Sequence, residues 1–308
     1  MKKIILTAQG LALLFSPALS LAANDPLSLW NDTADKQKII QFVTGITTDS
    51  SPTALPPPER VAVFDNDGTL WAENPVPLQY QFAIDQLKAV QNPNVPGLSA
   101  SDIQNLLKDP AKGLAGLNAD QKQALLKKTH TLTPIEYKQA VTYWLGSASS
   151  QALACHYKQL AYAPMVQLVD YLEQSGFKIY IIASPDSVDF TRILAEQMYG
   201  LPASQVLATP NTDQTNELRL DRIIGKEPVF AVGNSDADIP MLRYTSLNSP
   251  ALPVLIHHTD AAREWQYDHD AAYGQMDKAL NDATQYGWLV IDMKNDFKEM
   301  FMGNNCHH

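Results

Sequence analysis

The feature that most constrains the fold of this chain is a short apolar run, Val-Ala-Val-Phe at residues 61–64, that ends directly in the acids Asp65 and Asp67. A continuous run of this length, rich in β-branched residues, is typical of a strand buried on both faces of a sheet. Two neighbouring carboxylates at the end of a buried strand repel each other unless a cation joins them. The run therefore predicts a parallel sheet whose first strand leads into a cation site.

Four more apolar runs have the character of buried strands, at residues 179–183, 229–232, 254–256 and 288–291. Apolar residues at helical spacing occur between them, at residues 165–172 and 190–198, and before the first run, at residues 31–45. Strands that alternate with helices favour an α/β fold. We therefore expect a Rossmann-like parallel sheet with helices on both faces.

Residues 75–160 interrupt this alternation, because their apolar residues recur at helical spacing. One helix is expected to begin at Thr133, where a proline follows and Glu136 completes a capping box. The segment leaves the sheet just after its first strand, so it should rise over the carboxyl ends of the strands, where open α/β sheets bind ligands. We expect an all-α cap over residues 75–160 and a catalytic core made of residues 23–74 and 161–308.

The first residues have the pattern of a cleavable secretion signal. Two lysines precede an apolar stretch at residues 4–15, and Ser20 and Ala22 supply the small residues of a cleavage site. The stretch is too short to cross a bilayer core of ~30 Å. Residues 1–22 are interpreted as a signal peptide, which predicts a periplasmic or secreted protein with no stable membrane association after cleavage. A buried N-terminal helix or a retained anchor is the alternative.

Composition narrows the classes of ligand. The 308 residues carry a formal net charge of −10 and no basic cluster that would neutralise a run of phosphates, so nucleic acid is not expected as the main ligand. The two cysteines, Cys155 and Cys306, either pair or stay separate, and an oxidising compartment permits the bridge. The sequence carries no indication of the oligomeric state.

The acid pair predicts a specific chemistry. Mg²⁺ held by oxygen atoms of Asp65 and Asp67 would relieve their repulsion and allow Asp65 to attack a phosphate ester. Asp67 would protonate the leaving oxygen and later activate water. Gly68 would let the backbone turn sharply and present N–H groups to the phosphoryl oxygens. The alternatives are a hairpin turn built on Asn-Asp-Gly, or a Ca²⁺ loop, although Leu70 stands where such a loop has glycine.

Three segments resemble motifs of the haloacid dehalogenase superfamily. Residues 64–71, Phe-Asp-Asn-Asp-Gly-Thr-Leu-Trp, resemble the first motif of its phosphatases, Ile-Ile-Ala-Ser ending at Ser184 resembles the second, and Gly-Asn-Ser-Asp-Ala-Asp at residues 233–238 resembles the fourth. The resemblance implies that Asp65 is the nucleophile and that the Ser184 hydroxyl donates to the phosphoryl group. It also implies that a cap occupies the first insertion position.

The chain departs from this family pattern at two points. Asn234 stands where the family usually has a metal-binding acid, so Asn234 contributes an amide oxygen and Asp236 or Asp238 compensates, with Asp238 our choice of metal ligand. The family's phosphate-binding lysine has no clear counterpart. Lys226 precedes the strand at 229–232 and should lie at the wrong end of the sheet. Arg219 is better placed to bind phosphate, although a solvated surface arginine is an equal alternative.

Two further residues are candidates for the substrate pocket. Glu73 lies close behind the first motif and under the expected cap, where it would contact a cationic group of a substrate or form a surface salt bridge. His257 and His258 follow a strand, and one of them, for which we choose His257, would face the pocket or cap the next helix.

The sequence thus predicts a Mg²⁺-dependent phosphomonoester hydrolase that acts on a small phosphorylated metabolite through a phospho-Asp65 intermediate. A phosphotransferase of the same fold is one alternative, and a phosphate-ester-binding protein that has lost turnover is another, motivated by Asn234 and the missing lysine. Carbon–halogen hydrolysis is less favoured, because it needs neither a metal nor the second acid, Asp67.

Overall fold

The computed structural model describes residues 25–129, 132–209, 221–303 and 306, so the predicted signal peptide and Arg219 lie outside the described residues. Within the described residues, six parallel strands form one sheet in the order β5-β4-β1-β6-β7-β8. The strands are β1 (Val61–Phe64), β4 (Lys178–Ala183), β5 (Val206–Ala208), β6 (Phe230–Gly233), β7 (Leu252–His257) and β8 (Leu289–Asp292). The predicted α/β Rossmann-like fold is confirmed, and β5 is a strand that the sequence did not reveal.

The strand order places a topological switch beside β1. From β1 the chain adds β4 and then β5 on one side, and it continues with β6, β7 and β8 on the other. Connections that leave neighbouring strands in opposite directions open a crevice at the carboxyl edge of the sheet. The loops that follow β1 and β6 meet at this crevice.

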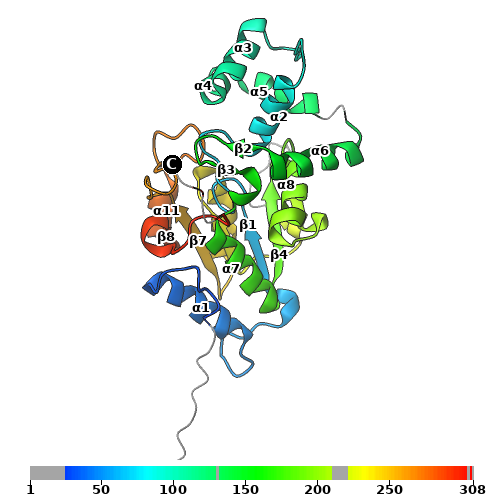
Figure 1. The fold of residues 1–308 in the computed structure, drawn as a ribbon. Helices are drawn as coiled ribbons and strands as arrows, with labels where there is room; N and C mark the ends of the chain where they lie inside the picture. The colour runs from blue at the N-terminus through cyan, green and yellow to red at the C-terminus, as the bar shows by residue number, and fades with distance from the viewer. Residues whose placement is uncertain (1–24, 130–131, 210–220, 304–305, 307–308) are drawn as a thin grey trace, which may run out of the picture.

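Helices cover both faces of the sheet, as expected (Figure 1). The side chains of Ala62 and Phe64 belong to the apolar cluster that includes helices α1 and α7, whereas Val61 and Val63 pack in a second cluster with α10 and α11. This alternation along β1 follows from the period of two in a strand. The helices are α1 (Ala34–Thr47), α7 (Ala163–Gln174), α10 (Ile239–Ser246) and α11 (Ala279–Tyr286).

A largely helical insertion separates β1 from α7. Figure 1 shows its helices beyond the end of the sheet that is opposite to α1. Residues such as Ile84, Leu106 and Leu125 give the insertion an apolar cluster of its own. Its elements are α2 (Leu78–Lys88), α3 (Ala100–Lys108), α4 (Pro110–Ala115), α5 (Ala119–Thr129), α6 (Pro134–Ser147), β2 (Ser149–Ser150) and β3 (Cys155–His156). The antiparallel β2–β3 ladder corrects the expectation that this segment is helical throughout.

The capping box at the start of α6 is confirmed. The Thr133 hydroxyl accepts from the Glu136 N–H while Glu136 accepts from the Thr133 N–H. The remaining short elements are η1 (Pro57–Glu59), η2 (Tyr157–Gln159), α8 (Val188–Leu194), the π-helical η3 (Ala195–Tyr199), η4 (Ala203–Gln205), η5 (Asp236–Asp238) and α12 (Met293–Asp296).

A disulfide joins Cys155 of β3 to Cys306, with a Cα–Cα distance of 5.2 Å, so of the two possibilities for the cysteines the structure has the paired one. The bridge ties the C-terminal end of the chain to the base of the insertion. Among the residues that the structure describes, no helix combines the length and apolar character needed to cross a membrane.

Candidate active site

The loop that follows β1 forms a tight turn at the carboxyl edge of the sheet. The Asp65 N–H donates to the Val232 carbonyl of β6 at 2.9 Å, which extends the pairing of β1 with β6. The Asn66 carbonyl then accepts from the N–H groups of Leu70 and Trp71, and the Gly68 N–H donates to the Trp71 carbonyl at 2.7 Å. With φ of +79°, Gly68 permits this turn. The N–H of Gly68 is therefore committed to the turn, and the expectation that other N–H groups of this loop face a phosphoryl group stays a prediction.

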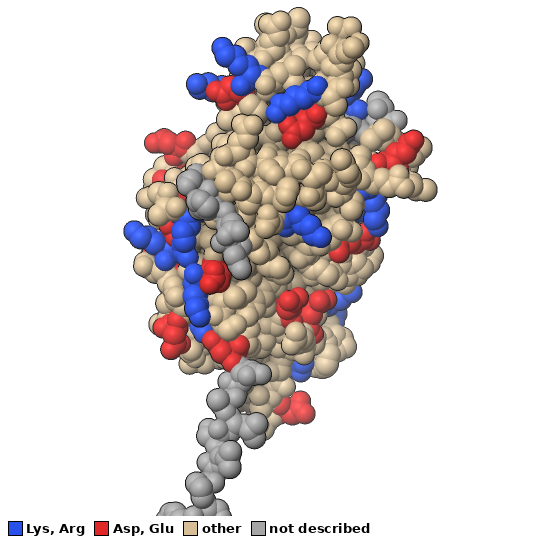
Figure 2. All heavy atoms as spheres, in the orientation of Figure 1, with Lys and Arg blue, Asp and Glu red and all other residues tan. Residues whose placement is uncertain are grey.

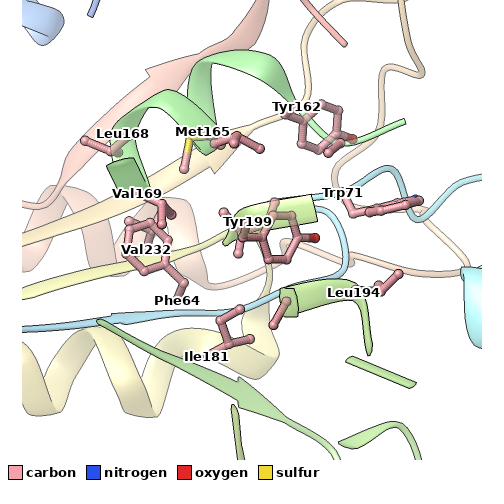
Figure 3. Packing of buried hydrophobic residues seen from close by; sticks show 14 of the residues in the cluster. Phe64, Trp71, Tyr162, Met165, Leu168, Val169, Ile181, Leu194, Tyr199 and Val232 are labelled. Atoms are coloured by element: carbon pink, nitrogen blue, oxygen red, sulfur yellow. The ribbon is translucent and has the colours of Figure 1, made fainter. Parts of the chain in front are cut away.

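The side chain of Asn66, between the two acids, is hydrogen-bonded to Asp67 and to Tyr199. Its Nδ2 donates to Asp67 Oδ1 at 2.8 Å, and its Oδ1 accepts from the Tyr199 hydroxyl at 2.9 Å. Tyr199 lies at the end of the π-helical η3, a distortion that often occurs at functional sites. Tyr199 and Phe64 belong to the same apolar cluster, and in Figure 3 the Tyr199 hydroxyl points toward the side where Trp71 lies. Asn66 and Tyr199 were not identified from the sequence, although the place of Asn66 between two acids was a usable signal.

Carboxyl groups converge at this edge and perturb each other. Burial raises the pKa of Asp65 well above its usual value, and the charges of Asp238, Asp67 and Glu73 add to the increase. Burial also raises the pKa of Asp67, partly offset by hydrogen bonds from Gln79 and Asn66. The pKa of Asp238 is raised by burial as well, against hydrogen bonds from Asn234 and Ser235. Both Asp65 and Asp67 keep some solvent contact, so they remain accessible to a ligand.

The site lacks a compensating protein cation in the described part of the chain. The ion pairs there involve other carboxylates, and none reaches Asp65, Asp67, Glu73 or Asp238. Groups of three or more His, Cys, Asp or Glu side chains arranged to hold a metal are also absent from the described residues. Mg²⁺ is usually bound through only one or two protein carboxylates and keeps several waters. Asp65 and Asp238, whose like charges repel each other, fit that donor set.

Asn234 is held between two side chains beneath the loop. Its Oδ1 accepts from the Thr69 hydroxyl at 3.1 Å, and its Nδ2 donates to Glu73 Oε1 at 2.8 Å. The side chain is only 1% exposed. The structure thus gives the amide oxygen predicted to bind metal a hydrogen-bond donor within the protein.

The two acids that follow Asn234 point in different directions. Asp238 Oδ2 accepts from the N–H groups of Asn234 and Ser235, each at 3.0 Å, and its charge acts on Asp65. The Asp236 carboxylate instead accepts from the backbone N–H groups of Lys278 and Ala279, at the start of α11. Of the two acids proposed to compensate for Asn234, only Asp238 is thus directed at Asp65.

Glu73 lies buried behind the loop. Its Oε1 accepts from the Tyr267 hydroxyl and from Asn234 Nδ2, each at 2.8 Å, and the side chain is 5% exposed. Burial raises its pKa well above the usual value, with hydrogen bonds from Tyr267 and Asn234 acting in the other direction. The surface salt bridge considered for Glu73 is therefore wrong. Tyr267 was not identified from the sequence, because it lies 194 residues further along the chain.

The other predicted residues lie at different places around this edge. Ser184 is exposed directly after β4, and its hydroxyl is 2.8 Å from that of Ser187. Lys226 donates to the carbonyl of Pro58, which precedes β1, so it lies at the opposite edge as expected. His257 ends β7, with Nε2 3.8 Å from Asp268 Oδ2. Residues 258–278 contain turns, bends and an isolated bridge but no helix, so His257 has no helix directly after it to cap.

The insertion contacts the loops at the carboxyl edge. Gln79 at the start of α2 hydrogen-bonds Asp67. Gln123 of α5 donates to Asp186, in the loop after β4, at 3.2 Å. Side chains of the insertion therefore border the crevice that holds the acid pair.

Comparison with protein-family models and with curated protein sequences gave no match. Among solved structures, a protein of unknown function from Bordetella pertussis Tohama I matches with a TM-score of 0.45 and 17% identity, covering 76% of this chain and 99% of its own. A haloacid dehalogenase hydrolase of family IA, variant 3, from Entamoeba histolytica has a TM-score of 0.35 and 14% identity, with 75% and 92% covered. A hydrolase of the same superfamily from Ehrlichia chaffeensis has a TM-score of 0.29 and 16% identity, with 64% and 86% covered. Likenesses this distant carry no argument about activity.

Proposed function

We propose that this chain is a Mg²⁺-dependent phosphomonoester hydrolase of the haloacid dehalogenase superfamily, with Asp65 as its nucleophile. The observation that supports this most is a set of carboxyl groups at the topological switch of the sheet, Asp65, Asp67 and Asp238. The charges of Asp67 and Asp238 raise the pKa of Asp65. Without a cation these carboxyl groups destabilise one another, and they lie at the position where open α/β sheets bind ligands. The motif resemblance points to the same residues.

In the proposed mechanism, Asp65 and Asp238 would hold Mg²⁺, with Asp67 beside them. The ion would offset the charge between these carboxylates and the phosphate ester. A carboxylate oxygen of Asp65 attacks phosphorus, and the bond from phosphorus to the ester oxygen breaks. Asp67, whose raised pKa keeps its proton to higher pH than an ordinary carboxyl group, gives that proton to the leaving oxygen. The product alcohol leaves, and Asp65 carries the phosphoryl group.

The second half of the reaction returns the enzyme to its starting state. Asp67, now ionised, takes a proton from a water molecule as that water attacks phosphorus. The bond between phosphorus and Asp65 breaks, and inorganic phosphate leaves. The hydrogen bonds from Asn66 and Gln79 keep the Asp67 carboxyl in place through both proton transfers.

We further propose that residues 75–160 act as a cap and that Ser184 and Arg219 bind the phosphoryl group. Contacts of Gln79 with Asp67 and of Gln123 with Asp186 support the first point. A cap that closes over the crevice would exclude bulk water and select the leaving group. Glu73, beneath the loop, and His257, at the rim of the pocket, are proposed as residues of the substrate pocket.

The proposed ligand is a small phosphorylated metabolite. On the face drawn in Figure 2, lysines and arginines are scattered among acids and do not form a broad basic surface. This distribution and the net charge of −10 agree with a substrate that carries one phosphate group rather than with a nucleic acid. Residues 1–22 support a periplasmic or secreted location as part of the proposal.

The test is hydrolysis of p-nitrophenyl phosphate and of a panel of phosphorylated metabolites, with Mg²⁺ and with EDTA. We expect turnover that EDTA removes, that Asp65→Asn abolishes and that Asp67→Asn reduces by about 10²-fold or more. His269→Gln is the matched control, because His269 is exposed and its ion pair is with Asp277, which has no role in the proposed mechanism. Turnover that survives Asp65→Asn would exclude Asp65 as the nucleophile.

A phosphate-ester-binding protein without turnover is the second candidate. It is favoured by Asn234, which contributes no charge, and by Lys226, which is held at the opposite edge of the sheet. Tight binding of a phosphate ester without release of phosphate would support it. A phosphotransferase would instead transfer the phosphoryl group to an added alcohol faster than to water.

A further inference from the structure

A buried histidine beneath the active-site loop has no role in the mechanism above. His258 follows β7 and is fully buried. Its Nε2 is 2.8 Å from the Gly68 carbonyl oxygen, and its Nδ1 is 3.1 Å from Glu264 Oε2. The imidazole stacks on the Tyr267 ring with a centroid distance of 4.2 Å and an interplanar angle of 23°. The ring is therefore fixed at both nitrogens and on one face.

The partners of His258 determine where its hydrogens lie. The Gly68 carbonyl oxygen can only accept, so Nε2 carries a hydrogen and donates it. On the other side, one hydrogen lies between Nδ1 and the Glu264 carboxyl group, and it is bonded either to Nδ1 or to the carboxyl oxygen. Both arrangements leave the donor at Nε2 unchanged.

Glu264 is itself held in place. Its Oε1 accepts from the Tyr162 hydroxyl at 2.7 Å, and its Oε2 accepts from the Trp265 N–H at 2.8 Å. The side chain is 1% exposed. Because the carboxyl group is fixed by these donors, it sets the orientation of the imidazole, in the way that carboxylates orient histidines at metal centres.

Gly68 is constrained from several directions, and His258 supplies the contact to its carbonyl group. The Gly68 N–H is committed to the Trp71 carbonyl. A Cβ atom at Gly68 would lie 2.1 Å from Asn234 Nδ2 and 2.3 Å from Glu73 Oε1, so that side of the residue is closed. Without the His258 donor the buried carbonyl would lack this partner, and the peptide would rotate to regain one. That peptide joins Gly68 to Thr69 within the turn that begins at Asn66, so its rotation would disturb the turn that holds Asp67, the residue before Gly68, relative to Asp65.

We propose that His258 is a positioning residue for the reaction: held by Glu264, it donates to the Gly68 carbonyl and so fixes Asp67 relative to Asp65. It touches no reacting atom, and its kinetic effect rests on the proposed function. Misplacing a catalytic group by about 1 Å can cost about 10²-fold in rate. The contribution of His258 should therefore appear in kcat more than in KM.

Two variants separate the hydrogen bond from the packing. His258→Phe keeps a planar ring on Tyr267 but removes the donor, whereas His258→Gln places an amide N–H near the position of Nε2. We expect His258→Phe to lower kcat by about tenfold or more with KM changed by less than about threefold, and His258→Gln to regain most of kcat. His269→Gln serves again as the control, since its ring lies on the surface.

A second readout does not depend on activity. The N–H groups of Leu70 and Trp71 donate to the Asn66 carbonyl within the same turn, so their hydrogen exchange reports on the turn. We expect exchange about tenfold faster in His258→Phe and unchanged in His258→Gln. A ¹⁵N spectrum of the unmodified protein should show a hydrogen on His258 Nε2.

The outcomes separate this inference from the proposed function. If the unmodified protein hydrolyses no ester of the panel, the proposed function fails, while the exchange rates and the ¹⁵N spectrum still decide the role of His258. A folded His258→Phe variant with unchanged kcat and exchange overturns the inference, as does an Nε2 without hydrogen. If His258→Phe does not fold, a His258→Gln variant with native kcat and exchange supports the inference, and one that loses both overturns it.

Discussion

Replacing Asn234 with aspartate tests the hydrogen-bond pattern beneath the active-site loop most directly. Asn234 donates to Glu73 Oε1 at 2.8 Å and accepts from Thr69 on its other side. Asn234→Asp keeps the acceptor for Thr69 but turns the donor toward Glu73 into a second carboxylate oxygen. Two acceptors would then face each other at hydrogen-bond distance in a site that is almost closed to water.

The size of the effect follows from the distance. Two unit charges 2.8 Å apart repel by roughly 6 kcal/mol at an effective dielectric constant of about 20. The chain escapes this cost by protonating one of the two carboxyl groups, which at pH 7 costs about 4 kcal/mol for a group with an ordinary pKa near 4. Because the pKa of Glu73 is already raised well above its usual value, protonating Glu73 costs less. We therefore expect Asn234→Asp to lower the free energy of unfolding by about 2–4 kcal/mol at pH 7.

The assay is urea unfolding in the presence of EDTA for Asn234→Asp, Glu73→Gln and the double variant. The loss in Asn234→Asp should shrink by about half or more between pH 7 and about pH 5, where protonation is cheap. In the double variant the glutamine amide donates to the new carboxylate, so most of the stability should return. The hydrogen-bond assignment would be refuted if Asn234→Asp were as stable as the unmodified protein at pH 7. It would also be refuted if the double variant lost more free energy of unfolding than the two single variants together.

Three further predictions concern Glu73, the glycines Gly274 and Gly287, and the disulfide. Glu73→Gln should make the free energy of unfolding depend less on pH. A carboxyl group with a raised folded-state pKa stabilises the native state at low pH, and this effect is lost as pH rises through that pKa. Urea titrations of both proteins at about pH 5 and pH 8 measure the difference. Gly274→Ala should cost about 3 kcal/mol or more in thermal unfolding, because φ is +69° and the new Cβ would lie 2.1 Å from Glu73 Oε1, whereas Gly287→Ala, with φ of +70° and open space, should cost only about 1–2 kcal/mol. Cys155→Ser should lower stability by about 2–5 kcal/mol, because it opens a bridge between residues 151 positions apart, and a reductant should lower the melting temperature of the unmodified protein alike.

The fold was predictable because buried parallel strands leave a strong local pattern. The run at residues 61–64 is buried at every position in the structure, as its composition indicated. β5 escaped notice, since its three residues, Val-Leu-Ala, are too few to show a period. The β2–β3 ladder is shorter still, and its polar Ser149 and Ser150 resemble a loop in sequence.

The candidate site was predictable only where its residues are neighbours in the sequence. Asp65 and Asp67 could be identified from the sequence, because two acids at the end of a buried apolar run are costly unless a cation or ligand compensates them. Glu73 was noticed by proximity, but its place in a buried hydrogen-bonded set was not, because that set includes Tyr267. Of the histidine pair the sequence favoured His257, and nothing in the spacing reveals that His258 is the fully buried member.

The buried polar residues and the acid pair have opposite effects on the folded state, and their combination explains the architecture of the loop. Asp65, Asp67 and Asp238 each have a raised pKa, so in the absence of a cation the native state is stabilised by protonation of these groups. Burying these carboxyl groups close together destabilises the native state. The hydrogen bonds of Asn66 and Asn234 offset part of this destabilisation by holding the turn in one geometry. A divalent ion bound as proposed would lower these pKa values and displace protons, so ion affinity, protonation and folding would be linked at one edge of the sheet.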